Sequence, residues 1–351
     1  LGYERQLEAL DVLHVLGVSP ESVHFLGFPD GGLDRLFTQV WTEPAWISPT
    51  TQTDHVPYMD VIAPQAPYTG QAALAAIRQL LADVMPEIIV SPHPLDQHPD
   101  HWASHAFAAL ALAVEQNAGK LWAQRAAHLT YLVHWPMWPL PMGLHNDLPG
   151  TVPADLLALD GRNWQEFVFD QEEIQRKKTA LLRYQSQVEL IKPFMLSFVR
   201  QTETFYQAHA LPLSDSEWLS MSLPNLTGWA KLVKHPQRIA QIQWKLTSAL
   251  QQCRLILRQF PEKGMEYTVV VHRDDSLGEL LRFAPTVEKT GREAEGLWEV
   301  VLTWPRTVYG LARQVMIGME LSVEEKMWDQ VPFYTYRLST VESARILRTK
   351  I

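Results

Sequence analysis

A short apolar run that leads directly into a dense polar cluster is the feature that most constrains the fold of this chain. The run covers residues 88–90, and the cluster covers residues 91–105. An alanine-rich helical pattern begins at Trp102. Strands that alternate with helices favour a parallel sheet with right-handed crossovers. Open α/β sheets place their chemistry where a strand ends and a helix begins, so the cluster is a candidate site.

The side chains of this cluster are of the kind that binds divalent metals. Its histidines and aspartates are His93, Asp96, His98, Asp100, His101 and His105. Imidazole and carboxylate groups together are typical zinc ligands. The alternative interpretation is a solvated loop punctuated by prolines. The density of ligand-type side chains favours a functional site.

Strand and helix patterns alternate through the first half of the chain. Apolar spacing predicts a helix over residues 72–84, and residues 23–26 and 130–134 are predicted strands. Asp170 and Glu173 form a capping-box pattern, which predicts a helix through residue 189. We therefore expect an α/β fold with a Rossmann-like, mostly parallel sheet and flanking helices.

The pattern changes after Leu211. Residues 239–250 are predicted to form a linking helix, and five β-type segments follow it, at residues 254–258, 267–272, 298–303, 315–321 and 333–338. They indicate a smaller, mainly antiparallel C-terminal β domain. The expected domains are residues 1–215, a linking helical segment at 216–250, and the β-rich residues 251–351. A chain of 351 residues exceeds the usual size of one hydrophobic core, which agrees with about two domains.

Composition excludes several classes of protein. The net charge of −9 argues against nucleic-acid binding, which requires a basic surface. A single cysteine, Cys253, excludes a disulfide framework and a cysteine-rich zinc site. Hydrophobic residues make up 46% of the chain, yet no apolar run is long enough to span a bilayer. The sequence does not decide whether the protein is located in the cytoplasm or in the cell envelope, and it does not give the oligomeric state.

Short motifs in a fixed order resemble those of a known enzyme family. The motifs are Arg5-x-x-Glu8, Leu16-Gly17-Val18, Leu26-Gly-Phe-Pro-Asp30, Pro86-Glu-Ile-Ile-Val90, His98-Pro-Asp-His101, Tyr131-Leu-Val-His134 and the helical stretch that carries Lys178, Tyr184, Ser186 and Gln187. Over about residues 1–205 the chain resembles the PIG-L/LmbE-like family of zinc-dependent N-acetylglucosamine de-N-acetylases, in its larger bacterial form. The order of the motifs carries the resemblance, since each motif alone is short.

The resemblance implies a role for several residues. It implies a Rossmann-like fold, with His101 as a ligand of zinc or another divalent metal. His98 would stabilise the oxyanion or protonate the leaving amine, and Asp100 would orient His98. Arg5 and Asp30 would bind hydroxyls of the sugar substrate. His93, Asp96 and His105 are possible second-layer residues around the metal.

One motif of the family is missing from the printed residues. A His-Pro-Asp-Asp segment, which supplies two ligands and the general base, is expected upstream of Arg5. We expect that this segment, with any targeting signal, precedes Leu1 in the native protein. His272-Arg-Asp-Asp275 follows an apolar run and could substitute for it, but turn composition favours a surface hairpin there.

Structural roles compete with the functional ones. Arg5 and Glu8 have the spacing of an intrahelical ion pair, and Asp30 suits a turn. His105 suits a helix surface as well as the surroundings of a metal. Tyr184, Ser186 and Gln187 suit a contact that ties a helix end to the core.

The first functional hypothesis is a metal-dependent hydrolase that removes the N-acetyl group from a GlcNAc-containing glycan or glycoconjugate. A catalytically incomplete sugar-binding or scaffold module is the second. An amide hydrolase that acts on a non-sugar substrate is the third, because a fold does not fix a substrate. The partners expected are a GlcNAc-bearing small molecule or glycan, and no nucleic acid.

Overall fold

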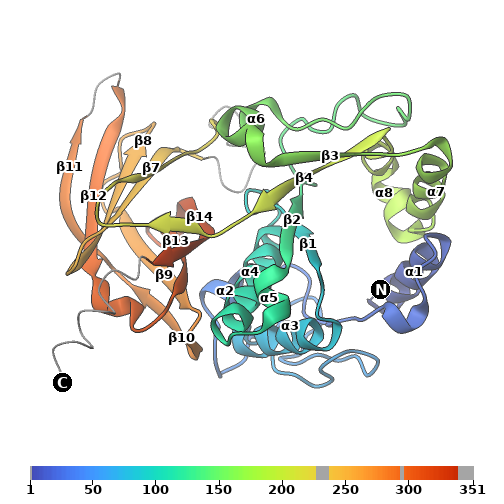
Figure 1. Ribbon diagram of the computed structural model, residues 1–351, viewed down its shortest axis with the longest axis horizontal. Coiled ribbons are helices and arrows are strands. Elements are labelled where there is room, and N and C mark those ends of the chain that lie inside the picture. Colours follow the sequence, from blue (N-terminus) through green and yellow to red (C-terminus); the bar gives the residue numbers. More distant parts are fainter. Residues whose placement is uncertain (1, 227–236, 293–295, 339–351) are drawn as a thin grey trace.

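The computed structural model describes residues 2–226, 237–292 and 296–338. In Figure 1 helices and a four-stranded sheet make up one side of the molecule, and two five-stranded sheets make up the other. None of the described helices is both long enough and apolar enough to cross a membrane.

The first part of the chain contains helices on a small sheet. Its helices are α1 (Gly2–Val15), α2 (Leu33–Thr38), α3 (Gly70–Val84), α4 (Pro99–Asn117), α5 (Leu121–Arg125), α6 (Ala154–Asp160), α7 (Gln171–Leu181) and α8 (Gln185–Leu196), with 3-10 turns η1 (Pro20–Ser22) and η2 (Gly161–Asn163). Its strands are β1 (Ile88–Pro92), β2 (Ala127–Tyr131), β3 (Trp164–Val168) and β4 (Thr202–Ala208).

The four-stranded sheet is mixed, so the predicted mostly parallel core is found only in part. The strand order is β1-β2-β4-β3. β1 and β2 are parallel, because α4 carries the chain back across the sheet between them. β4 is antiparallel to both β2 and β3. Residues 23–26 were expected to be a strand, but they lie outside any described strand.

Helix α4 is the centre of the first core. It lies against β1, α2 and α3, and almost its whole circumference is buried. Its alanines allow this close packing, since they present little side-chain volume to their neighbours. Phe37 of α2 and Phe107 of α4 meet edge-on, with ring centres 4.9 Å apart. The predicted amphipathic helix over residues 72–84 is confirmed as α3, and Thr69 caps it by accepting from the Ala72 N–H.

The second part of the chain is a pair of packed sheets. Its strands are β5 (Leu211–Leu213), β6 (Leu219–Ser222), β7 (Ile239–Leu246), β8 (Leu250–Leu257), β9 (Glu266–Arg273), β10 (Ser276–Phe283), β11 (Thr286–Arg292), β12 (Trp298–Pro305), β13 (Gln314–Val323) and β14 (Lys326–Leu338), with a 3-10 turn η5 (Arg306–Tyr309). The orders are β10-β9-β13-β14-β5 and β11-β12-β8-β7-β6. All pairings are antiparallel except β14 with β5. The five predicted β segments are confirmed.

Two helix predictions are wrong. Residues 239–250 were expected to link the domains as a helix, but Ile239–Leu246 forms β7, in which buried and less buried side chains alternate. Of the rest of the expected linking segment, residues 227–236 lie outside the described part. The helix that starts at the Asp170–Glu173 capping box ends at Leu181, and α8 then begins at Gln185. The domain boundaries remain a prediction.

The two parts of the molecule share buried contacts. Phe37 of α2 packs edge-on against Phe333 of β14, with ring centres 5.2 Å apart. His272 of β9 places its Nε2 2.9 Å from the backbone oxygen of Phe37. His272 is buried, whereas a surface hairpin was predicted around it. The hairpin exists as β9–β10, but this histidine belongs to the core under α2.

Candidate functional site

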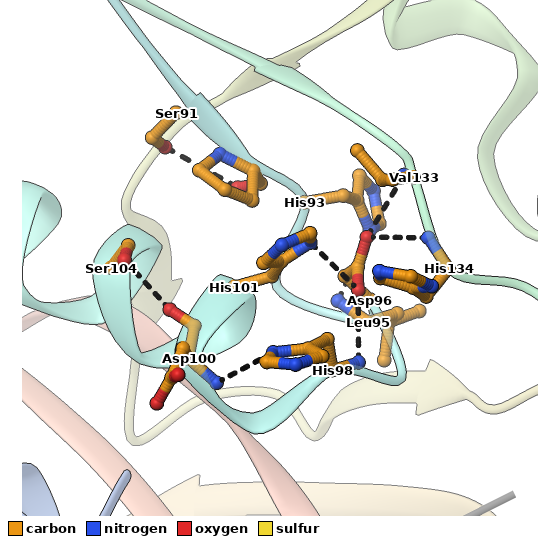
Figure 2. A network of polar contacts seen from close by, with 11 residues as sticks. Ser91, His93, Leu95, Asp96, His98, Asp100, His101, Ser104, Val133 and His134 are labelled. Atoms are coloured by element: carbon orange, nitrogen blue, oxygen red, sulfur yellow. Dashed lines mark hydrogen bonds and ion pairs between the residues drawn. The ribbon is translucent and has the colours of Figure 1, made fainter. Parts of the chain in front are cut away.

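The polar cluster lies where β1 ends and α4 begins, as Figure 2 shows. His98 is the N-cap residue of α4, and its Nδ1 accepts a hydrogen bond from the Asp100 N–H at 3.2 Å. Pro99 occupies the first turn, where a fixed φ suits a helix and no N–H is needed. Because Nδ1 is an acceptor, a neutral His98 carries its proton on Nε2.

Asp96 is the hub of the cluster. Its carboxylate is buried and accepts from the backbone N–H groups of Val133, His134 and His98 at 2.9, 3.0 and 2.9 Å. Its Oδ1 also lies 3.2 Å from Nδ1 of His101. Burial alone would raise the pKa of Asp96, but His101 and the backbone donors outweigh it and hold this pKa below its ordinary value. Asp96 is therefore an ionised group that joins the end of β1 to the segment after β2.

Three imidazole rings surround this carboxylate, and we call the group of Asp96, His98, His101 and His134 the Asp96 cluster (Figure 2). The ring centres lie 4.7 Å apart for His98 and His101, 4.9 Å for His101 and His134, and 5.3 Å for His98 and His134. Phe194 of α8 stacks on His134 at 5.6 Å. Burial lowers the pKa of His134 below its ordinary value, so this ring is neutral near pH 7.

His134 is the residue that the sequence interpretation missed. It was included in a predicted strand, but β2 ends at Tyr131 and His134 follows it. A usable signal was present. β1 and β2 are parallel neighbours, and the residues that follow such strands meet at one edge of the sheet.

Asp100 has a different contact from the one expected. Its carboxylate accepts from the backbone N–H groups of Gly31 and Leu33 at 2.7 and 3.0 Å. It was expected to orient the ring of His98, but here the contact with His98 runs through the Asp100 backbone N–H. Asp100 instead fixes the loop that carries Asp30 to the first turn of α4. Gly31 suits this loop, since its φ is +74°.

The two predicted sugar-binding residues lie on different elements. Asp30 is exposed in the turn beside Gly31, and is linked to the cluster through Asp100. Arg5 is exposed on α1, which packs against α7. The Glu8 carboxylate accepts hydrogen bonds from the backbone N–H and the hydroxyl of Ser186, both at 2.7 Å. The positive charge of Arg5 also acts on this carboxylate. Ser186 thus ties the start of α8 to α1, as the structural interpretation expected.

His93 and His105 lie outside the Asp96 cluster. His105 is buried, although a helix surface was considered for it, and its Nδ1 lies 3.3 Å from the Ser91 hydroxyl. The same hydroxyl lies 2.7 Å from Nε2 of His128. His93 stacks on Trp164 of β3, with ring centres 5.4 Å apart. These residues line a separate cavity.

The side chains at the Asp96 cluster fit zinc in chemical type but do not form a full ligand set. Imidazole and carboxylate are zinc ligands, and a histidine whose Nδ1 faces a carboxylate, as that of His101 faces Asp96 at 3.2 Å, can offer Nε2 to a metal. Structural and catalytic zinc sites take three or four protein ligands. Within residues 2–226, 237–292 and 296–338, no group of three or more His, Cys, Asp or Glu side chains is arranged to hold a metal ion.

The N-terminal third of the chain matches a known protein family. Residues 1–112 match the family model PIG-L: GlcNAc-PI de-N-acetylase. The matched segment ends inside α4 and contains Asp96, His98 and His101. The PIG-L resemblance is confirmed for this segment, which is about a third of the chain. The chain matches none of the curated proteins with which it was compared.

Proposed function

We propose that this protein is a zinc-dependent deacetylase that removes the N-acetyl group from a GlcNAc-containing glycan or glycoconjugate. One observation carries the proposal. Within the segment that matches PIG-L, His98 and His101 gather around the buried, ionised Asp96 at the end of a strand. Amide hydrolysis requires groups that move protons and stabilise an oxyanion, and imidazoles positioned by a carboxylate can do both.

His101 is the proposed metal ligand. Asp96 orients its ring from the Nδ1 side, as carboxylates beside ligating histidines commonly do. Zinc, or another divalent metal, would polarise the amide carbonyl and lower the pKa of a water molecule when bound. The remaining roles belong to side chains of the chain itself.

His98 and His134 suit the oxyanion and the proton transfers. His98 keeps Nδ1 engaged with the α4 backbone, so its Nε2–H can donate a hydrogen bond to the oxyanion. Neutral His134 is a base able to take a proton from the attacking water, and the imidazolium so formed can return that proton to the leaving amine. The water oxygen bonds to the carbonyl carbon, the carbon–nitrogen bond breaks, and acetate and a protonated amine leave. Arg5 and Asp30 are proposed to bind sugar hydroxyls.

The test measures two quantities on the full chain, together with any sequence that flanks it in the native protein. We expect stoichiometric zinc by elemental analysis and acetate release from a GlcNAc conjugate. The proposal is overturned if the protein binds no zinc and releases no acetate. Acetate release from simple N-acetyl amides at an equal rate would instead support a non-sugar amide hydrolase.

A second function is favoured by one feature of the site. The described side chains bring fewer than three metal donors into one ligand group, which suits a sugar-binding module without catalysis. Such a module would bind GlcNAc conjugates saturably and release no acetate at any zinc concentration. Binding and hydrolysis measured on the same preparation separate the two functions.

A further inference from the structure

A cavity of about 580 Å³ lies between the helical part and the β-rich part. Its walls come from α4, β2, β3, β4, α6, β6 and β14, and Figure 1 shows α6, β4 and β14 at the junction of the two parts. His93, His105 and His128 line it, whereas the four residues of the Asp96 cluster do not. Its volume is that of a small-molecule site, which typically measures about 300–1,000 Å³.

One wall of the cavity is aromatic. Trp164 of β3 lies nearly parallel to the ring of His93, at an interplanar angle of 13°. Tyr206 of β4 stands edge-on to both rings, with centres 5.5 Å from Trp164 and 5.2 Å from His93. Trp164 is half-buried and lines the cavity, so part of its surface is available to a ligand. An aromatic ring offers a broad apolar face to a flat apolar surface.

The histidines of the cavity present fixed hydrogen-bonding groups. Burial lowers the pKa of His93 and of His128 to about 4 and that of His105 well below its ordinary value, so all three are neutral. The Leu95 N–H donates to Nδ1 of His93, which leaves the ring proton on Nε2 as a donor.

Ser91 couples the other two histidines. Its hydroxyl lies between Nε2 of His128 and Nδ1 of His105, and it also lies 3.3 Å from the Pro92 carbonyl oxygen. If the hydroxyl donates to one histidine and accepts from the other, one ring keeps a donor at its second nitrogen and the other keeps an acceptor; if it donates to Pro92 and accepts from both, both rings keep acceptors. In every case the pair offers at least one acceptor to a ligand.

Asp160 at the end of α6 adds an acceptor. Its Oδ2 accepts from the Tyr206 hydroxyl at 3.0 Å and from Asn163 at 2.7 Å. No described protein donor bonds to its Oδ1, and Asp160 lines the cavity. A carboxylate oxygen in this position accepts strongly from a hydroxyl group.

We propose that this cavity is a sugar-binding site, distinct from the Asp96 cluster, that takes a neutral pyranose unit. A pyranose offers a flat apolar C–H face to Trp164. Its hydroxyls both donate and accept, which matches Asp160, His93 and the His105–His128 pair. The neutral imidazoles give no counter-charge to an acidic sugar, and the lining carries both a carboxylate, Asp160, and a guanidinium, Arg337, rather than charges of one sign. The proposal requires neither a metal nor hydrolysis, and so it does not depend on the proposed deacetylase function.

The test titrates the full chain with methyl β-glucopyranoside, a sugar without an amide, by calorimetry or ligand-observed NMR. We expect saturable binding. Trp164→Ala should weaken it about 10-fold, because the stacking surface is lost, and Trp164→Phe should stay within about 3-fold of the wild type. His98→Ala, in the Asp96 cluster, should leave the affinity unchanged.

A second variant guards against misfolding of Trp164→Ala. Asp160→Asn keeps the side-chain shape and should weaken binding by about 10-fold through the loss of a charged acceptor, with an unchanged thermal midpoint. The proposal is overturned if the wild type shows no saturable binding. It is also overturned if His98→Ala abolishes binding while Trp164→Ala and Asp160→Asn retain it, since the sugar would then occupy the Asp96 cluster.

Discussion

Nδ1 of His101 lies 3.2 Å from Oδ1 of Asp96, inside a buried network that joins the ends of β1 and β2. The aspartate is fixed by three backbone N–H groups, so it holds the ring of His101 rather than following it. This relationship gives the histidine a set orientation before any ligand binds.

His101→Ala is expected to abolish metal binding, whereas His98→Ala should keep the metal and lose activity. Removal of a hydrogen-bond donor to the oxyanion typically costs about 10²–10³-fold in rate. Elemental analysis and acetate release on both variants check the assignment. Metal retained at the wild-type level in His101→Ala would show that this residue is not a ligand.

Asp96→Asn should destabilise the fold by about 1–3 kcal/mol at pH 7, because an amide nitrogen replaces one acceptor oxygen in a buried network. The pKa of Asp96 is lowered in the folded state, so its stabilisation is present above the unfolded pKa of about 4 and is lost as pH falls through the folded value. Urea unfolding should therefore show a constant difference between wild type and variant near neutrality. That difference should shrink below about pH 4.

Buried histidines predict a loss of stability in mild acid. The folded pKa of His128 is about 4, below an unfolded value of about 6.5. Between these two values the unfolded state binds more protons, so the free energy of unfolding should fall as pH decreases from about 6.5 to 4. The loss from His128 is of the order of 3 kcal/mol at most.

His128→Gln removes this titrating group and is the matched comparison. Its unfolding free energy should depend less steeply on pH over the same interval than that of the wild type. NMR titration of the imidazole signals measures the pKa directly. A folded pKa of His128 near 6.5 would contradict the prediction.

Phe37→Ala should destabilise the protein by about 3–5 kcal/mol. Phe37 is fully buried, and its ring contacts Phe107 of α4 and Phe333 of β14, so the variant leaves a cavity between the two parts. Phe167→Ala, at a position 45% exposed, is the control and should cost far less. Equal shifts of the unfolding midpoint in the two variants would argue against this account of the core.

Elements with a strong local pattern could be predicted from the sequence. Helix α3 has an apolar stripe, a threonine cap and a following proline, and all of these signals agree. Strand β7 shows the opposite case. Ile239, Ile242 and Leu246 fit a helical spacing, but Ile242, Trp244 and Leu246 also alternate. Pairing with β8, which is distant information, decides between the two patterns.

In the candidate site, too, residues that are close in sequence could be predicted, and residues that are brought together only by the fold could not. Asp96, His98 and His101 lie within six positions of one another, so their residue types alone indicated a site. His134 and the sugar cavity depend on contacts between strands that are far apart in the sequence. The role of Asp100 was hidden for the same reason, since its partners Gly31 and Leu33 are more than 60 residues away.

The Asp100 carboxylate accepts hydrogen bonds from the backbone N–H groups of Gly31 and Leu33, so the Asp30 loop and the first turn of α4 move together. His98 and His101 belong to that same turn. A ligand that displaces Asp30 therefore also displaces the first turn of α4, and so ligand binding at the loop changes the positions of both histidines. A deletion in this loop, or a more flexible loop sequence, would change the positions of the two histidines although neither residue is substituted.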